Sequence, residues 1–294
     1  MKIMVYEARP DERADLEKQA ALHGVELSVT DAVPTLENAS LAAGCIGVSI
    51  LGQGCIDAAL LDAYHALGIR YLSTRTIGYD HIDLDHARSI GLRVCSASYA
   101  PNGVADFTVM MILMCLRHYK QALWRGQVND FSLTGLQGRE MKDLTIGIIG
   151  TGRIGAQVAR NLSGFGCRIL AYDLRRNPAV EPQVTYVDFD TLLAQSDVIT
   201  LHMPLLDSNR HIINRESIAK MRDGVVIVNC SRGELADIEA LIEGIETGKI
   251  GALGMDTVEG DEGIIHADHR VDILPNRNWF YLHQFRNVIM TQHM

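Results

Sequence analysis

The segment from residue 144 to 173, LTIGIIGTGRIGAQVARNLSGFGCRILAYD, constrains the fold more than any other part of the chain. A short β-branched run precedes Gly150, Gly152 and Gly155, which follow the spacing G-x-G-x-x-G. In this pattern the first glycine makes a tight turn, the second lets backbone approach a pyrophosphate, and the third lets a helix pack close to the strand. Asp173 ends a second apolar strand, where an acid would accept hydrogen bonds from the adenosine ribose. The segment therefore predicts a dinucleotide site, and the acid favours NAD over NADP because a 2′-phosphate would face a carboxylate.

Composition places the chain among ordinary globular proteins and argues against several kinds of partner. With 294 residues, 47% hydrophobic and 21% charged, the chain is long enough for two domains with buried cores. The net charge of -9, with no lysine or arginine run, argues against nucleic acid. The longest apolar run, within 107–116, is too short to span a bilayer, and the N-terminus does not resemble a signal peptide. Six scattered cysteines indicate reduced thiols in a cytoplasmic protein.

Strand-like and helix-like segments alternate along the chain, which predicts an α/β fold with two doubly wound parallel-sheet domains, residues 1–98 and 99–294. One long helix is expected from Pro101 to about Leu123, and a long loop from Glu259 to Phe280. The other expected helices are 11–22, 56–67, 215–221 and 234–247. The expected strands outside the glycine segment are 2–6, 26–29, 46–50, 70–73, 93–95, 198–201, 225–229, 252–255 and 288–290.

Polar groups follow several expected strands of the second domain, where open parallel sheets place their ligands. Arg232 follows the strand 225–229 and is able to hold a carboxylate by two parallel hydrogen bonds, although most arginines form surface salt bridges. His293 follows the last strand, but a lone histidine near a terminus is more often inert than catalytic. The residues alone leave both interpretations open.

Taken together, these features resemble the D-isomer-specific 2-hydroxyacid dehydrogenases, in the branch of the D-lactate and vancomycin-resistance dehydrogenases. The resemblance covers nearly the whole chain and implies a flavodoxin-like catalytic domain followed by a Rossmann NAD-binding domain. It rests on motifs that occur in the family's order: TRTIGYDHID at 74–83, YAPNGVAD at 99–106, DFTVMMILMCLR at 106–117, the glycine segment, HMP at 202–204, NCSRG at 229–233 and MDTVEGDEG at 255–263.

The resemblance implies a role for each matching residue. Arg232 would hold the substrate carboxylate and polarise the keto group, while backbone N–H groups around Ile77 and Gly78 hold the carboxylate from the other domain. His293 would give a proton to the carbonyl oxygen as hydride arrives. Asp261, paired with His293, would keep the imidazole charged.

A second group of residues is implied to bind the cofactor. Asp256 and the backbone near Cys230 would position the nicotinamide carboxamide, with Val104 lining the cofactor cleft and Tyr99 the substrate side. The remaining cofactor residues are Gly150, Gly152, Arg153, Ile154, Gly155, Asp173, His202, Met203 and Pro204.

The sequence departs from the family pattern around the proposed base. Asp261 stands where the family has glutamate, with Glu262 as a nearby substitute. Gln292 stands where the family usually has proline, which should loosen the backbone before His293. The sequence ends one residue after His293, so we expect that end to fray and the catalytic domain to lack the family's returning helix.

Three functions are compatible with these features. The first is NAD-dependent reduction of a small 2-keto acid to the (R)-2-hydroxy acid by a homodimer. The alternative is a non-enzymatic NAD-binding regulator on the same fold, and the third is a different Rossmann oxidoreductase. No metal is expected, because the loop cluster of His266, Asp268 and His269 is typical of solvated side chains.

Overall fold

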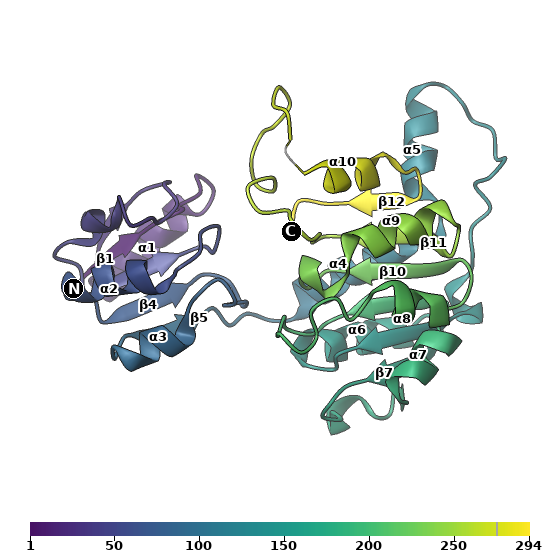
Figure 1. Cartoon of the computed structure of the whole chain (residues 1–294), viewed down its shortest axis with the longest axis horizontal. Helices are drawn as coiled ribbons and strands as arrows, with labels where there is room; N and C mark the ends of the chain where they lie inside the picture. Colours follow the sequence, from purple (N-terminus) through teal and green to yellow (C-terminus); the bar gives the residue numbers. More distant parts are fainter. Residues whose placement is uncertain (275) are drawn as a thin grey trace. The chain divides into compact units, whose positions relative to one another are not determined.

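Parallel sheets organise both halves of the chain, as the alternation of strands and helices predicts (Figure 1). The structure is a computed structural model that describes residues 1–274 and 276–294. It divides into two compact units, Met1–Tyr99 and Ala100–Met294. Among the described residues, no helix combines the length and the apolar character needed to cross a bilayer.

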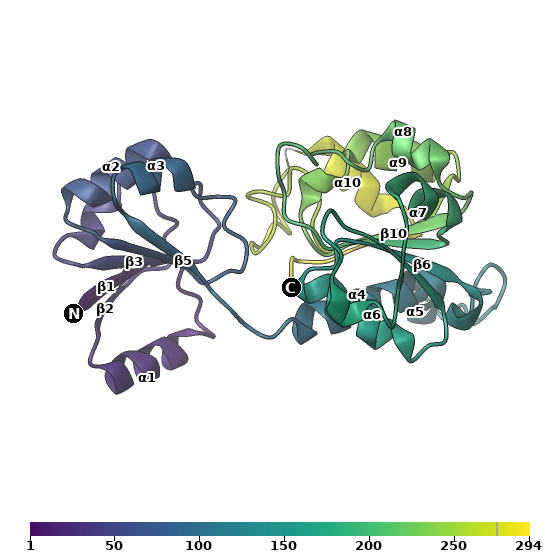
Figure 2. The same cartoon turned by 90° about the horizontal axis from the view of Figure 1, so that it is seen from below.

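The first unit is built on a five-stranded parallel sheet in the order β2-β1-β3-β4-β5. Figure 2 shows α1 on one face of this sheet and α2 and α3 on the other. Large side chains such as Tyr6, Ile50 and Leu72 are fully buried in its core. The strands are β1 (Lys2–Val5), β2 (Glu26–Val29), β3 (Gly47–Ile50), β4 (Tyr71–Thr74) and β5 (Arg93–Ser96). The helices are α1 (Arg13–His23), α2 (Ala58–Ala66) and α3 (Leu84–Ser89).

The second unit has a seven-stranded parallel sheet in the order β12-β11-β10-β9-β6-β7-β8. The chain moves outward from β6 to β8 and then returns to place β9 on the other side of β6. The strand order therefore reverses between β6 and β9, which is where open α/β sheets bind ligands beyond the strand ends. The strands are β6 (Thr145–Ile149), β7 (Arg168–Tyr172), β8 (Thr185–Tyr186), β9 (Val198–Leu201), β10 (Val225–Asn229), β11 (Ile250–Met255) and β12 (Val288–Met290).

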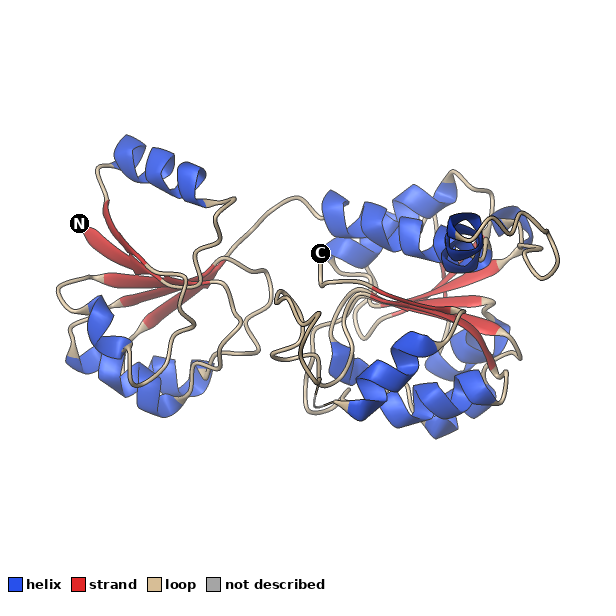
Figure 3. Cartoon of the chain, turned by 90° about the horizontal axis from the view of Figure 1, so that it is seen from above, coloured by secondary structure: helices blue, strands red, loops and turns tan. Residues whose placement is uncertain are grey.

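Helices cover both faces of this second sheet (Figure 3). One face packs against α4 and α6 and the other against α7, α8, α9 and α10 (Figure 2), which gives two apolar cores on either side of the strands. Strand β10 is buried along its whole length, as expected for a central parallel strand. The helices are α4 (Asn102–Leu116), α5 (Tyr119–Gln127), α6 (Arg153–Ser163), α7 (Phe189–Gln195), α8 (Arg215–Lys220), α9 (Ile238–Glu246) and α10 (Arg277–Gln284).

Two expectations about the helices are wrong. The single helix expected over 101–123 is interrupted, because His118 adopts a left-handed backbone with φ of 50° and separates α4 from α5. The carbonyl of Leu116, at the end of α4, accepts a hydrogen bond from Arg139 N–H at 3.1 Å. The loop expected over 259–280 also ends early, because Asn276 caps α10 by accepting a hydrogen bond from Trp279 N–H at 3.0 Å.

Candidate active site

Three glycines shape the loop between β6 and α6, each in a different way. Gly150 has a φ of 94°, which lies in the left-handed region that favours glycine. A Cβ on Gly155 would lie 1.9 Å from the Gly150 carbonyl oxygen, so the helix packs against the turn without room for a side chain. A Cβ on Gly152, by contrast, would meet nothing within 4 Å, which leaves space at the N-terminus of α6. This loop fits the pyrophosphate of a dinucleotide, because it combines a tight turn, an open approach to the backbone and a closely packed helix. Arg153 and Ile154 lie in the first turn of that helix.

Asp173, which directly follows β7, is hydrogen-bonded to this glycine loop. Its Oδ2 accepts from Thr151 N–H at 2.6 Å and from the Thr151 hydroxyl at 3.1 Å, and its Oδ1 accepts from Arg175 N–H at 2.9 Å. A carboxylate has about four lone-pair directions, so these three contacts leave capacity for a ribose hydroxyl. Thr151 is not predictable from the sequence, since the variable positions of the glycine motif carry no signal of their own.

The loop after β9 lies against the glycine turn. A Cβ on Gly150 would be 2.5 Å from the His202 carbonyl oxygen, and His202 Nε2 is 3.0 Å from the Thr200 hydroxyl. Burial lowers the pKa of His202 to about 3, so this imidazole is neutral at pH 7. The Met203 carbonyl accepts from the Ser231 hydroxyl at 2.6 Å, and the Pro204 carbonyl from the Asn209 side-chain amide at 2.8 Å. His202 is therefore an uncharged packing group beside the phosphate loop.

The turn after β10 is organised by the fully buried Asn229. Its side-chain amide donates to the Arg232 carbonyl at 2.7 Å, and its side-chain oxygen accepts from Ser231 N–H at 3.0 Å. The half-buried Arg232 guanidinium donates from Nη1 to the Ser231 carbonyl at 2.8 Å. Cys230 is buried between them, which raises the pKa of its thiol to about 12. A Cβ on Gly233 would be 2.3 Å from the Val258 carbonyl carbon, so this turn is packed directly against the loop after β11.

Asp256 follows β11 and connects that strand to the segment after β12. It is 4% exposed, and its backbone N–H donates to the Asn229 carbonyl at 2.9 Å. Its carboxylate accepts from the Thr291 hydroxyl at 2.6 Å and from Met294 N–H at 3.1 Å to each oxygen. The segment around His293 is thus hydrogen-bonded to Asp256 on both sides.

Asp261 forms a turn within the long loop that follows β11. Its Oδ2 accepts a hydrogen bond from Val258 N–H at 3.0 Å. Burial raises the pKa of this carboxyl to about 6, with the Val258 hydrogen bond acting in the opposite direction and the charges of Glu262 and Glu234 adding to the increase. Asp261 is therefore ionised at pH 7.5 but close to its titration range.

The side chain that stacks on His293 is His266. The ring centroids are 6.0 Å apart with an angle of 29° between the planes, and His266 Nε2 lies 3.2 Å from the His293 carbonyl oxygen. Figure 1 shows the loop after β11 passing beside the C-terminus. The sequence offers His266 only as one member of a loop cluster, and this contact across the unit is set by folding rather than by local spacing.

The substrate residues expected in the first unit lie at the carboxyl end of its sheet. Ile77 and Gly78 belong to the half-buried loop after β4, where the Thr76 hydroxyl donates to the Gly78 carbonyl at 2.7 Å. Tyr99 is 48% exposed at the end of this unit. Val104 belongs to the second unit and packs from α4 against the core that α4 and α6 form. Within the described ranges 1–274 and 276–294, no group of three or more histidine, cysteine or carboxylate side chains is placed to hold a metal ion.

Comparisons with known proteins agree with this arrangement. Residues 109–294 match the family model for the NAD-binding domain of the D-isomer-specific 2-hydroxyacid dehydrogenases. An aromatic 2-oxoacid reductase of Clostridium sporogenes is 41% identical over 298 residues, which is 100% of this chain and 89% of the relative.

Solved structures give the same result. The pyruvate reductase of Chlamydomonas reinhardtii superposes with a TM-score of 0.88 at 35% identity, covering 100% of this chain and 89% of the other. The NAD complex of the D-isomer-specific 2-hydroxyacid dehydrogenase from Lactobacillus delbrueckii ssp. bulgaricus superposes with a TM-score of 0.82 at 31% identity, covering 100% and 90%. The chain therefore belongs to the D-isomer-specific 2-hydroxyacid dehydrogenases and is an NAD-dependent oxidoreductase.

Proposed function

We propose that the chain reduces a small 2-keto acid to the (R)-2-hydroxy acid, with His293 as the proton donor and Arg232 as the carboxylate anchor. The observation that carries this proposal is the position of the two side chains. Arg232 follows β10 and His293 follows β12, and the segments that carry them are both hydrogen-bonded to Asp256, which follows the intervening strand β11 at the carboxyl end of the sheet.

The residue types match the charge that the reaction creates. NADH, when bound, supplies the hydride to the keto carbon. As the carbonyl oxygen gains negative charge, the Arg232 guanidinium stabilises it and His293 transfers a proton to it. The product then carries a hydroxyl, and His293 is left neutral. Asp261, ionised above pH 6, favours the protonated imidazole before transfer.

The first unit completes this proposal as the substrate domain, with residues 100–294 as the NAD-binding domain. Backbone N–H groups around Ile77 and Gly78 would bind the substrate carboxylate, and Tyr99 would contact the substrate side chain. These groups suit an acid because backbone N–H donors and a guanidinium both bind carboxylates well.

The test is NADH oxidation by the purified protein with a panel of 2-keto acids. Arg232→Ala should abolish turnover and leave NADH affinity nearly intact. Arg160→Ala, which alters an exposed arginine on α6, is the matched control and should retain activity. Tight NADH binding without turnover of any keto acid would instead support the non-enzymatic regulator.

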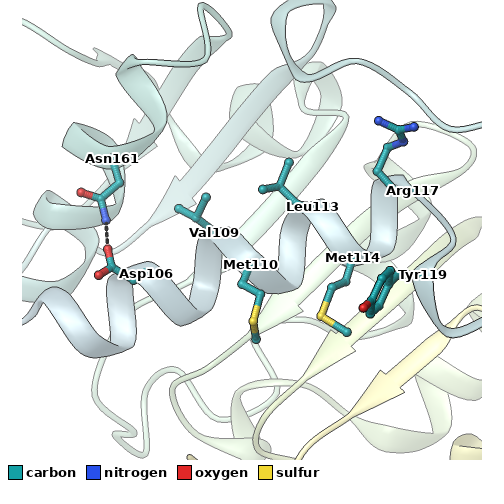
Figure 4. Close-up of a pocket in the computed structure, with 8 residues that line it drawn as sticks. All are labelled: Asp106, Val109, Met110, Leu113, Met114, Arg117, Tyr119 and Asn161. Carbon is teal, nitrogen blue, oxygen red and sulfur yellow. Dashed lines mark hydrogen bonds between the residues drawn. The ribbon is translucent and has the colours of Figure 1, made fainter. Parts of the chain in front are cut away.

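We further propose that the enzyme is a homodimer that associates through α4 and α5. A groove of about 640 Å³ runs along α4. Figure 4 shows Met110, Met114 and Tyr119 side by side among its lining residues, with Asp106 hydrogen-bonded to Asn161. Its lining is largely apolar, and apolar surfaces of this kind are typical of subunit interfaces. Large exposed apolar side chains continue along α5 and the arm after it: Leu123, Trp124, Val128, Phe131 and Leu133.

A second copy of this chain is the occupant that we assign to this face. Light scattering after size-exclusion chromatography should give twice the chain mass, and Met110→Asp should give a monomer. A wild-type monomer at micromolar concentration would refute the dimer.

None of the six cysteines is paired in the structure, which supports a reducing, cytoplasmic location.

A further inference from the structure

His266 and His293 share an unusual local geometry. Both have backbone dihedrals in the left-handed region, with φ of 62° and 59°. A non-glycine residue in this region is held there at a cost by its surroundings, and such residues are enriched at functional sites. The two side chains stack, so each strained residue lies against the other. The contact joins the loop after β11 to the segment after β12.

The hydrogen bond between them defines the proton position on His266. A carbonyl oxygen can only accept, so the 3.2 Å contact to the His293 carbonyl requires a hydrogen on His266 Nε2. His266 therefore acts as a donor toward the backbone of His293 and, through its ring, limits the space in which the His293 imidazole can rotate.

The neighbours of His293 are held by other groups. Thr291 N–H donates to the Met255 carbonyl at 3.0 Å, and Met294 N–H donates to Asp256. These bonds fix the chain before and after His293 but do not involve its own carbonyl or its ring. Gln292, unlike a proline, does not restrict the backbone at this point. The His266 contact thus adds a restraint on His293 itself.

We propose that His266 is a positioning residue for the proton donor of the reaction, acting on both the backbone carbonyl and the ring of His293. This inference rests on the proposed role of His293 in keto acid reduction. The hydrogen bond fixes the peptide that follows the imidazole, and the stacked ring holds the imidazole in one orientation toward the substrate. Displacement of a catalytic group by about 1 Å can lower the rate on the order of a hundredfold.

Three substitutions separate the two contacts. His266→Ala removes both the donor and the ring, and should lower kcat about tenfold or more while the Kd for NADH stays within twofold. His266→Gln keeps an N–H donor able to reach the His293 carbonyl and should recover part of the lost kcat. His266→Phe keeps a flat ring without the donor. Comparison of its kcat with that of His266→Ala shows how much of the loss in kcat comes from stacking and how much from hydrogen bonding.

The matched control is His269→Ala. His269 lies on the same loop, but its Nδ1 is within hydrogen-bond distance of the Asp272 carboxylate, at 2.9 Å, and His269→Ala should retain wild-type kcat. Turnover is measured with a saturating keto acid, NADH binding by fluorescence, and folding by the melting temperature of each variant.

The possible outcomes are distinct. A low kcat for His266→Ala, unchanged NADH binding and recovery in His266→Gln would support the inference. Wild-type kcat in His266→Ala, combined with an inactive His293→Ala, would overturn it and leave the proposed function standing. Loss of NADH binding in His266→Ala with no recovery by glutamine would also overturn it, because a general loop defect would then explain the result. A wild-type protein without turnover would overturn the proposed function, and the role of His266 with it.

Discussion

Replacing Asp261 with asparagine tests the burial of this carboxyl and its proposed relation to His293 in a single variant. Asparagine keeps an oxygen that can accept the hydrogen bond from Val258 N–H but removes the charge. In the wild type that charge lies in a partly buried loop beside Glu262 and Glu234, and burial raises the pKa of Asp261 from 3.8 to about 6. The ionised form is therefore less stable in the folded protein than in the unfolded chain.

Proton linkage determines how the stability contributed by Asp261 changes with pH. Because the folded pKa is the higher one, the folded protein holds more protons than the unfolded chain between about pH 4 and pH 6. The stability that this group contributes is complete below pH 4 and is lost as pH rises to 6. A difference of about 2 pKa units corresponds to about 3 kcal/mol at 1.36 kcal/mol per unit. Partial exposure of the loop reduces this, so we expect about 1–2 kcal/mol.

The assay is equilibrium unfolding of wild type and Asp261→Asn at pH 4.5 and pH 7.5. The free energy of unfolding of the variant, relative to that of the wild type, should be about 1–2 kcal/mol higher at pH 7.5 than at pH 4.5. This corresponds to a relative increase of roughly 2–8 °C in melting temperature for a domain of this size. The kcat of the variant at pH 7.5 should fall, because the charge that we propose favours the protonated His293 imidazole is lost. Glu262→Gln, at the exposed neighbouring position, is the control and should show a smaller effect on both measurements.

An equal stability difference at the two pH values would refute the burial argument, whatever the activity. A gain in stability with unchanged kcat would show that the carboxyl is buried but does not act on His293. The expected combination, a more stable and less active variant, is the usual consequence of keeping a charged group partly buried for function.

Three further predictions concern the cofactor site and the thiols. Gly155→Ala should unfold or strongly destabilise the protein in thermal melts, because its Cβ would lie 1.9 Å from a carbonyl oxygen, whereas Gly152→Ala should melt normally and lose NADH affinity in a fluorescence titration. Asp173→Asn should narrow the preference for NADH over NADPH about tenfold in kcat/KM, since a repelling charge near the 2′-phosphate is removed; an unchanged ratio would contradict this role. A thiol titration of the native protein should label Cys55 and Cys95 first, because the other four cysteines are less exposed; rapid reaction of a buried cysteine would disagree with the structure.

The sequence predicts the strands better than the helix ends. The strands Glu26–Val29, Val198–Leu201, Val225–Asn229 and Val288–Met290 are found with the expected bounds, because buried parallel strands are short apolar runs with clear limits. The break at His118 is not predictable in this way. It depends on a left-handed residue and a hydrogen bond from Arg139 to Leu116, a contact between positions far apart in sequence.

The candidate site also combines features that follow from local sequence with features that depend on distant contacts. The roles of Gly150, Gly152 and Gly155 follow from their spacing, because each is a property of the local backbone. The neighbour of His293 does not, since spacing cannot show that the Asp261 carboxylate accepts from Val258 while His266 lies against His293. Loop conformation decides this, and loops are the part of the chain that local pattern describes least.

Asp256 has a consequence for how such an enzyme can change. The resemblance assigns this residue to the nicotinamide, and the structure shows it accepting hydrogen bonds from Thr291 and Met294 on either side of His293. With the roles proposed for Asp256 and His293, a substitution of Asp256 would alter the nicotinamide contact and also release the peptide that bears His293. On this proposal one side chain adjusts both hydride delivery and proton delivery, and we expect variants at Asp256 to change the two steps together.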